Sequence, residues 1–241
     1  MAHLESKVAV ITGASAGIGA AIARDLSAAG AKLVLTARRR ERLDALAKEL
    51  GGPVATLAAD IADPATPERL LALARERFGA ADILVNNAGI LRVGPLDTFD
   101  LGGIEDMVAT NYTAVVRASY VFARAMKAAG TGIIVNISSI GAGIVAPGVG
   151  VYGGLKRAVE MFTDSLRIEL VGTGVRAGFV APGTTTTEIF EDMKAHGQPG
   201  WDSYVTPLQP EDIARAVRFL IDQPAHAAVP RVHVYAAGDT F

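Results

Sequence analysis

The sequence of 241 residues contains no cysteine, which excludes disulfide bonds, thiol catalysis and cysteine-ligated metals. Its four histidines are scattered without the spacing of metal ligands, so we expect no metal site. No hydrophobic run is long enough to cross a bilayer, and we expect no membrane partner. Glu5 and Lys7 precede only a short apolar run, unlike a signal peptide, which makes the cytoplasm the expected location.

An excess of charge is also missing. The formal net charge is −2, and the only dense positive run, Arg38 to Arg40, is too short to form a surface for duplex nucleic acid. We therefore expect no nucleic-acid partner. What the chain does have is 50% hydrophobic residues, enough at this length to build the core of one domain.

Short aliphatic runs alternate with longer amphipathic segments, as in a parallel sheet that helices cover on both faces. The predicted strands are Val8–Thr12, Lys32–Thr36, Val54–Ala58, Ile83–Asn86, Ile133–Ile137, Arg176–Val180 and Arg231–Val234. The predicted helices are Gly17–Ala29, Arg40–Leu50, Pro67–Phe78, Gly103–Ala128, Val151–Leu170 and Pro210–Ile221. The pattern predicts a single three-layer α/β domain over residues 1–241 with a seven-stranded parallel sheet. Residues 184–206 lack periodicity and are expected to form a substrate loop.

The first predicted strand runs directly into the glycine-rich segment TGASAGIG, residues 12–19, and a predicted helix follows. Glycines let the backbone approach a pyrophosphate, and the free N–H groups at the start of a helix attract the same anion. This strand, turn and helix, followed by a second strand, favour a dinucleotide site. The alternative is that Gly17 and Gly19 only permit close packing of helix and strand.

The end of the second predicted strand bears on the choice of dinucleotide. An acidic residue there would bind the ribose hydroxyls of NAD, whereas an arginine favours the 2′-phosphate of NADP. This chain has Ala37 in place of the acid, and Arg38 follows it. Because a guanidinium binds two phosphate oxygens and stacks on adenine, we expect NADP(H). NAD is one alternative, and simple solvation of these arginines is another.

Three further segments complete a known pattern: NNAG at 86–89, NISS at 136–139 and YGGLK at 152–156. Together with TGASAGIG, in this order and spacing, they make the chain resemble the short-chain dehydrogenase/reductase family over essentially its full length. The resemblance implies a Rossmann-type fold and an NADP(H)-dependent oxidoreductase that transfers hydride between the nicotinamide and a carbonyl or alcohol substrate. It also implies four catalytic residues, Asn111, Ser139, Tyr152 and Lys156, and a homodimer or homotetramer.

In this family Tyr152 would exchange a proton with the substrate oxygen, although a phenol with an ordinary pKa near 10 is a weak base at neutral pH. Lys156 follows one helical turn later. At about 4 Å and an effective dielectric of about 20, its charge would lower the pKa of the phenol by about three units. The resemblance also assigns Lys156 to the nicotinamide ribose.

Ser139 lies thirteen positions before Tyr152, as the resemblance requires, and its hydroxyl would bind the substrate oxygen. Ser138 is the alternative at this place. Asn111 matches an asparagine that, in relatives, bends the central helix and holds a proton-relay water near the lysine. The alternative is a buried asparagine that only caps the backbone.

The resemblance also implies contacts with the cofactor along the whole dinucleotide. They are Gly13, Ser15, Gly17, Ile18 and Gly19 at the pyrophosphate, Arg38 at the 2′-phosphate, Asp60 and Ile61 at the adenine, Asn87, Ala88 and Gly89 along the dinucleotide, and Pro182, Gly183, Thr185 and Thr187 near the nicotinamide. An aspartate after a strand is commonly a helix cap, which is the alternative for Asp60.

Gly153 and Gly154, between the tyrosine and the lysine, are costly in a helix by about 1 kcal/mol each. We interpret both as permitting close approach of neighbouring helices and the cofactor.

The residues expected to face the substrate are mainly apolar: Ile140, Ile144, Val145, Val149, Phe190, Met193 and Trp201.

Two ionisable residues of the loop are left open by the sequence. Lys194 is the main candidate for binding a substrate carboxylate, with a solvated lysine as its alternative, and His196 is ambiguous. For the whole chain, the alternative of another class is an NADP(H)-binding sensor or scaffold without turnover. The intact set of Asn111, Ser139, Tyr152 and Lys156 argues against that alternative.

Overall fold

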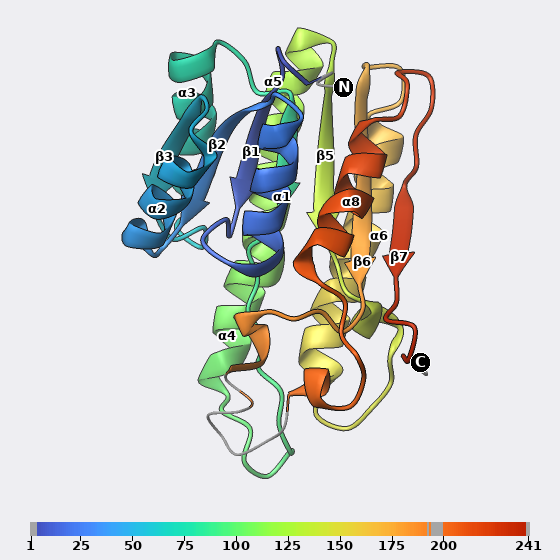
Figure 1. Cartoon of the computed structure of the whole chain (residues 1–241). Coiled ribbons are helices and arrows are strands. Elements are labelled where there is room, and N and C mark those ends of the chain that lie inside the picture. The colour runs from blue at the N-terminus through green and yellow to red at the C-terminus, as the bar shows by residue number, and fades with distance from the viewer. Residues whose placement is uncertain (1–3, 192, 194–199, 240–241) are drawn as a thin grey trace.

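The computed structural model describes residues 4–191, 193 and 200–239. Seven parallel strands form one sheet in the order β3-β2-β1-β4-β5-β6-β7 (Figure 1). They are β1 Val8–Thr12, β2 Lys32–Ala37, β3 Val54–Ala58, β4 Ile83–Asn86, β5 Gly132–Ile137, β6 Val175–Pro182 and β7 Arg231–Val234. This confirms the predicted sheet. The strand order reverses between β1 and β4, and a crevice forms at such a switch point beyond the carboxyl ends of the strands.

Helices cover both faces of the sheet (Figure 1). They are α1 Gly17–Ala28, α2 Arg40–Leu50, α3 Thr66–Phe78, α4 Gly102–Val108, α5 Ala114–Ala129, α6 Gly150–Glu169 and α8 Pro210–Ile221. Side chains of α1, α2 and α8 share one buried cluster, and side chains of α3, α5 and α6 share a second one. The three predicted layers are therefore present.

Strand β1 shows why its sequence is continuously apolar. Ala9 and Ile11 face the cluster that contains α1, whereas Val8 and Val10 face the cluster that contains Phe122 of α5. All four strand side chains are fully buried. Since a strand covered on both faces has no solvent side, it shows no polar alternation.

The predicted helix Gly103–Ala128 is interrupted, which corrects the sequence expectation. Helix α4 ends at Val108, the segment Ala109–Thr113 forms a π-helical turn, and α5 begins at Ala114. The side chain of Asn111, inside this turn, bonds to the backbone of Ile90 instead of facing solvent. A π turn adds one residue to the helical turn and is often found at functional sites.

The base of the predicted substrate loop is paired to the chain that follows it. Thr185 forms a parallel bridge with Leu208, and the Thr186 N–H donates to the Leu208 carbonyl at 2.9 Å. Short 3₁₀ turns occupy Glu188–Phe190 and Trp201–Ser203. Lys194 and His196 lie outside the described residues. Among the residues the structure does describe, there is no helix fit to span a membrane and no group of three or more potential metal ligands.

Candidate active site

A cavity of about 980 Å³ opens at the carboxyl ends of the central strands. In Figure 1 these ends point to the same lower edge of the sheet, where α4 and the segment after β6 gather. The glycine-rich turn, the ends of β4, β5 and β6, and the first residues of α6 all contribute to its wall. The volume lies at the upper end of the range for ligand sites, so it can accommodate a large ligand.

The glycine-rich turn owes its path to residues that adopt positive φ angles. Gly13 has φ +67° and Gly17 has φ +52°, values that side-chain-bearing residues rarely adopt. Ala16, which precedes α1, provides no side-chain cap, so the first N–H groups of the helix have no side-chain acceptor there. Such a helix start attracts an anion.

Gly19 has a different task from the other glycines of this turn. A Cβ atom at Gly19 would collide with the carbonyl oxygen of Gly13 and would lie 2.5 Å from Asn87 Nδ2. Gly19 itself is buried. The close-packing alternative therefore describes Gly19, whereas Gly17 lines the cavity.

Thr12 and Asn87 join the two strands on either side of the switch point. The Thr12 hydroxyl accepts from the N–H groups of Asn87 and Ala88, both at 3.0 Å, and Asn87 Nδ2 donates to the Thr12 carbonyl at 2.9 Å. This double connection fixes the turn after β1 against the end of β4. The sequence argument expected Asn87 only at the dinucleotide and missed its structural contacts with Thr12.

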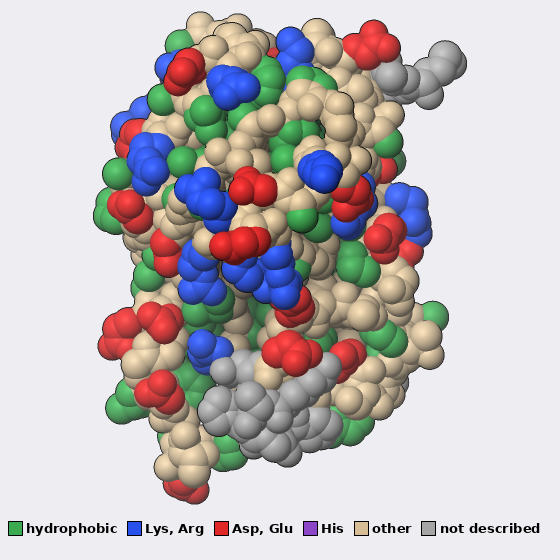
Figure 2. Space-filling model, turned by 60° about the vertical axis from the view of Figure 1, so that its left-hand side comes forward, with side chains coloured by type: hydrophobic (Ala, Val, Ile, Leu, Met, Phe, Trp, Pro, Cys, Tyr) green, Lys and Arg blue, Asp and Glu red, His purple; other side chains and the backbone are tan. Residues whose placement is uncertain are grey.

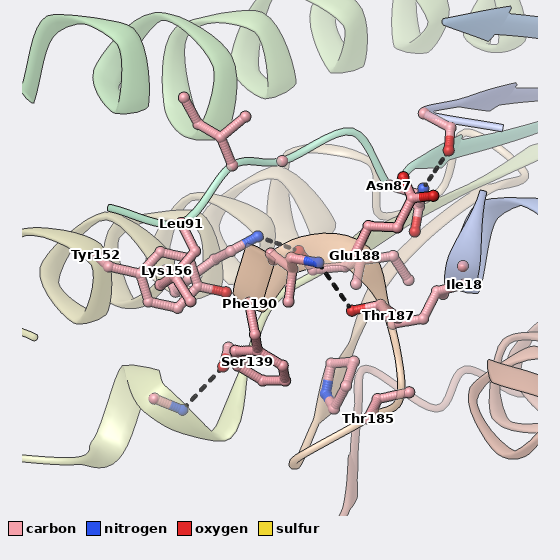
Figure 3. A pocket seen from close by; sticks show the side chains of 18 of the residues that line it. Ile18, Asn87, Leu91, Ser139, Tyr152, Lys156, Thr185, Thr187, Glu188 and Phe190 are labelled. Atoms are coloured by element: carbon pink, nitrogen blue, oxygen red, sulfur yellow. Dashed lines mark hydrogen bonds between the residues drawn. The ribbon is translucent and has the colours of Figure 1, made fainter. Parts of the chain in front are cut away.

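Helix α6 brings Tyr152 and Lys156 to one face, and Ser139, two residues after the end of β5, lies beside them (Figure 3). Lys156 Nζ lies 5.8 Å from the centre of the Tyr152 ring and donates to the Ile137 carbonyl at 2.9 Å. Ser139 caps a short 3₁₀ turn by accepting the Gly141 N–H at 3.0 Å, and its hydroxyl is close enough to Tyr152 to affect the pKa of the phenol. The three side chains thus meet at one end of the cavity.

Burial shifts both titrating groups of this cluster. It raises the pKa of Tyr152 to about 12, against a smaller lowering by the hydrogen bond with Ser139. It lowers the pKa of Lys156 to about 8. The expected fall of the Tyr152 pKa toward neutrality is therefore wrong for this chain, because loss of hydration dominates and the ammonium lies beside the ring. Tyr152 is a neutral phenol, suited to donate a proton.

Ser138, the alternative to Ser139, faces a different partner. Its hydroxyl donates to Glu160 Oε1 at 2.9 Å, and Glu160 also pairs with Arg157 at 3.0 Å. Both Ser138 and Glu160 are buried. The structure therefore ties Ser138 to α6 and leaves Ser139 beside the phenol.

Asn111 is fully buried behind the cavity wall. Its Oδ1 accepts from the Ile90 N–H and its Nδ2 donates to the Ile90 carbonyl, both at 2.8 Å. These bonds match the alternative of a backbone-capping asparagine. A Cβ atom at Gly89 would lie 3.4 Å from Asn111 Oδ1 and 3.6 Å from Lys156 Nζ. Asn111 and Lys156 therefore lie near each other, as the relay prediction requires.

The structure gathers nearly all the predicted site residues around one cavity. Those that line it are Gly13, Ser15, Gly17, Ile18, Arg38, Asp60, Ile61, Asn87, Ala88, Gly89, Ser139, Tyr152, Lys156, Pro182, Gly183, Thr185 and Thr187. Asp60 Oδ1 also accepts the Ala62 N–H at 2.9 Å, so it braces a turn, and the N-cap position of α3 belongs to Ala65.

Residues 7–198 match the model of the short chain dehydrogenase family. The chain belongs to this family. A probable NADP-dependent dehydrogenase of Haemophilus influenzae is 35% identical over 99% of this chain and 96% of its own length. Sulfoacetaldehyde reductase 2 of Chromohalobacter salexigens is 37% identical over 95% of this chain and 94% of its own. The closed form of a serine dehydrogenase complexed with NADP⁺ superposes with a TM-score of 0.87 at 33% identity, covering 94% of each chain.

The residues of this short-chain dehydrogenase that were expected to face a substrate are apolar, and most of them lie on the cavity wall. Ile140, Ile144, Val149, Phe190 and Trp201 line the cavity as predicted. Met193 is buried in a cluster with Phe190, Leu91, Met107 and Tyr152. The prediction that Val145 faces the pocket is wrong, because its side chain is fully exposed. Ile144 has an extended backbone and faces the cavity, so the next side chain in the segment points the other way.

Arg92 is a pocket residue of this dehydrogenase that the sequence argument missed. It lies in the segment after β4 and lines the cavity. Its aliphatic part packs against Gly103 of α4, where an added Cβ atom would lie 3.2 Å from Arg92 Cγ. No local motif marks it, since its place on the wall depends on the path of the chain between β4 and α4.

The arginines after β2 also differ from the expectation. Arg38 is exposed and lines the cavity, as predicted for a phosphate ligand. Arg39, which the sequence argument did not single out, lines it too and bonds to Ser15 and Glu188. The sequence argument considered only Ala37 in place of an acid at the end of β2, and it did not find the carboxylate of Glu188, which lies 149 residues from Arg39 in the sequence.

Proposed function

We propose that this short-chain dehydrogenase is an NADP(H)-dependent oxidoreductase that interconverts a carbonyl compound and an alcohol, with Tyr152 exchanging a proton with the substrate oxygen. The observation that carries the proposal is the meeting of Tyr152, Ser139 and Lys156 in a cavity whose other end is a glycine-rich turn. The NADP-linked relatives support the choice of cofactor.

The residues present fit a dinucleotide with a 2′-phosphate. Gly13 and Gly17 keep the turn free of side chains, and α1 offers its uncapped N–H groups to a pyrophosphate. Arg38, exposed at the end of β2, would bind the 2′-phosphate. Bound NADPH supplies a hydride to the substrate carbon.

Tyr152 would donate its proton to the substrate oxygen as negative charge develops there, because its raised pKa keeps the phenol protonated at neutral pH. Ser139, whose hydroxyl lies beside the phenol, would hold the same oxygen. Lys156, the neighbour of Asn111 behind Gly89, would bind the nicotinamide ribose and return protons to Tyr152.

The substrate we propose is a small aldehyde or ketone. Ile144, Val149 and Phe190 offer it an apolar wall, and Arg92 adds a cationic group to the same cavity. The names of two relatives, a sulfoacetaldehyde reductase and a serine dehydrogenase, refer to small substrates that carry an anionic group. A screening panel should therefore contain neutral aldehydes and ketones beside aldehydes that carry a carboxylate or a sulfonate.

The proposal is tested by titrating the protein with NADPH and NADH and then following NADPH absorbance with the panel. We expect tighter binding of NADPH and its oxidation by at least one carbonyl compound. Preference for NADH would favour the NAD-linked alternative, and NADPH binding without turnover across the panel would favour a sensor. Binding of neither nucleotide would overturn the proposal.

Arg38→Ala tests the phosphate site within this proposal. We expect the variant to bind NADPH about ten- to a hundredfold more weakly than the wild type does, because only NADPH carries the 2′-phosphate. Its affinity for NADH should fall by less than about twofold. An equal loss for both cofactors would remove Arg38 from the phosphate site.

A further inference from the structure

Glu188 carries the one carboxylate that, among the described residues, joins two arginines at the rim of the cavity. Its Oε2 lies 2.6 Å from Arg39 Nη1, and its Oε1 lies 2.5 Å from Arg42 Nη1. The side chains of Glu188 and Arg39 are 48% and 43% exposed, so the contact is open to solvent and to competition by other ions. Figure 2 shows acidic side chains among a gathering of Lys and Arg side chains on this face.

Arg39 connects Glu188 to the glycine-rich turn. Its Nε and Nη2 donate to the Ser15 hydroxyl at 3.3 and 3.0 Å, while its Nη1 donates to Glu188. Ser15 and Arg39 line the cavity next to Arg38, the proposed ligand of the 2′-phosphate. The carboxylate of Glu188 therefore uses a guanidinium in the region where this phosphate would bind.

The charge of Glu188 makes the contact antagonistic to a phosphate. Hydrogen bonds from Arg42 and Arg39 hold the pKa of Glu188 below its usual value, so the carboxylate is ionised at neutral pH. A phosphate dianion beside it meets a like charge and needs the same guanidinium donors. The two anions therefore compete for Arg39, which lines the cavity, while Arg42 holds Glu188 from the other side.

We propose that Glu188 is a specificity-determining residue that competes with the cofactor 2′-phosphate for Arg39 and so limits the affinity for NADP(H). This inference rests on the proposed NADP(H) function. In this account the 2′-phosphate has to displace the Glu188 carboxylate from the Arg39 guanidinium before it can bind there.

The position of Glu188 links this displacement to the substrate wall. Thr187, the residue before it, packs against the glycine-rich turn, since a Cβ atom at Gly17 would lie 3.0 Å from Thr187 Cγ2. Phe190, two residues later in the same 3₁₀ turn, packs edge-on against Trp201 with ring centres 5.8 Å apart. Glu188, Thr187 and Phe190 lie on one segment along the cavity (Figure 3). Release of Glu188 should therefore alter the surroundings of Trp201.

Two adenosine ligands without a nicotinamide isolate the phosphate effect: adenosine 2′,5′-bisphosphate and 5′-AMP. Calorimetry should show that Glu188→Gln binds the bisphosphate about three- to tenfold more tightly than the wild type, because one like charge is removed at a partly screened site. Binding of 5′-AMP should change by less than about twofold. Glu49→Gln is the matched control, because Glu49 is another exposed carboxylate paired with an arginine, Arg24, but on α2 away from the cavity wall. It should leave both affinities unchanged.

Trp201, the only tryptophan of the chain, gives the second readout. The bisphosphate should change its fluorescence in the wild type, whereas 5′-AMP should not. In Glu188→Gln the spectrum without ligand should already be shifted toward that of the bisphosphate complex.

The outcomes separate this inference from the proposed function. If the wild type binds the bisphosphate no better than 5′-AMP, the phosphate site itself is wrong. If the wild type prefers the bisphosphate but Glu188→Gln binds it equally or more weakly, the phosphate site stands and competition by Glu188 is overturned. Weaker binding would mean that Glu188 holds Arg39 in place for the phosphate.

Discussion

Tyr152 and Lys156 respond to the same burial in opposite directions, because a phenol is charged when it loses a proton and an amine when it gains one. The pKa of Tyr152 rises to about 12 and that of Lys156 falls to about 8. At residue scale, the spacing of these two side chains was predictable from helix geometry. Their pKa values were not, because burial depends on how the Ile137 carbonyl, Ser139 and α6 pack around them.

The shift at Lys156 makes a prediction about stability and pH. Between pH 8 and 10.5 the unfolded chain holds more protons at this lysine than the folded chain does, so the free energy of unfolding should rise with pH. Below pH 8 the folded protein bears the cost of a buried charge, and above pH 10.5 both states are neutral. Between pH 8 and 10.5 the free energy of unfolding of the wild type should rise by about 3 kcal/mol more than that of Lys156→Met.

Urea unfolding of both proteins at several pH values measures this difference, and other titrating groups cancel in the comparison. If the free energies of unfolding of the wild type and Lys156→Met changed equally with pH, the lowered pKa of Lys156 would be contradicted. Tyr152 is present in both proteins, so its own effect above pH 10 does not enter.

At the scale of elements, strands are the part of the fold that the sequence predicts best. The bounds of β1, β3, β4 and β7 agree with the prediction to the residue. Apolar runs between turn signals mark β1 and β4, which are buried throughout, and aliphatic residues also mark the less buried edge strands β3 and β7. The family resemblance implied a bend of the central helix at Asn111, but the π turn between α4 and α5 and the contact of Asn111 with Ile90, 21 residues away, left no signal in the sequence. The Glu188 contact with Arg39 spans 149 residues and leaves no local pattern.

The two glycines of α6 give a matched pair of variants. A Cβ atom at Gly153 would lie 2.7 Å from the backbone oxygen of Gly141, whereas at Gly154 it would meet nothing within 4 Å. We expect Gly153→Ala to lower the free energy of unfolding by about 1–3 kcal/mol through overpacking. Gly154→Ala should raise it by up to about 1 kcal/mol through helix propensity.

Chemical denaturation of the two variants checks this expectation. If both variants changed the free energy of unfolding equally, or if Gly154→Ala lowered it, the interpretation of Gly153 as closely packed and Gly154 as open would be contradicted. The close-approach interpretation of the sequence thus holds for Gly153 and fails for Gly154.

At the scale of the whole molecule, the reversal of strand order brings the ends of β1, β4, β5 and β6 to one cavity, although the residues involved span most of the chain. The family motifs predicted this gathering. They did not predict the outer surface, where Met161 and Ile168 of α6 are 67% and 63% exposed. Tyr120 of α5 packs edge-on against Phe162 of α6, so these helices present one partly apolar face.

This face leads us to expect a homodimer or homotetramer. Met161→Glu combined with Ile168→Glu should lower the mass in light scattering to that of the single chain, because charges cannot be buried unpaired in an apolar interface. Leu96→Glu, an exposed leucine in the segment before α4, is the control and should leave the mass unchanged. A wild-type monomer would contradict the expectation.

The most direct test of the proposed chemistry is to compare Tyr152→Phe with the wild type, measuring both NADPH affinity and the rate of carbonyl reduction with a substrate found in the panel. The variant keeps the ring and loses only the proton donor, so we predict an unchanged NADPH affinity within about twofold and a rate lower by about 10²–10⁴-fold. A rate equal to that of the wild type would contradict Tyr152 as the proton donor.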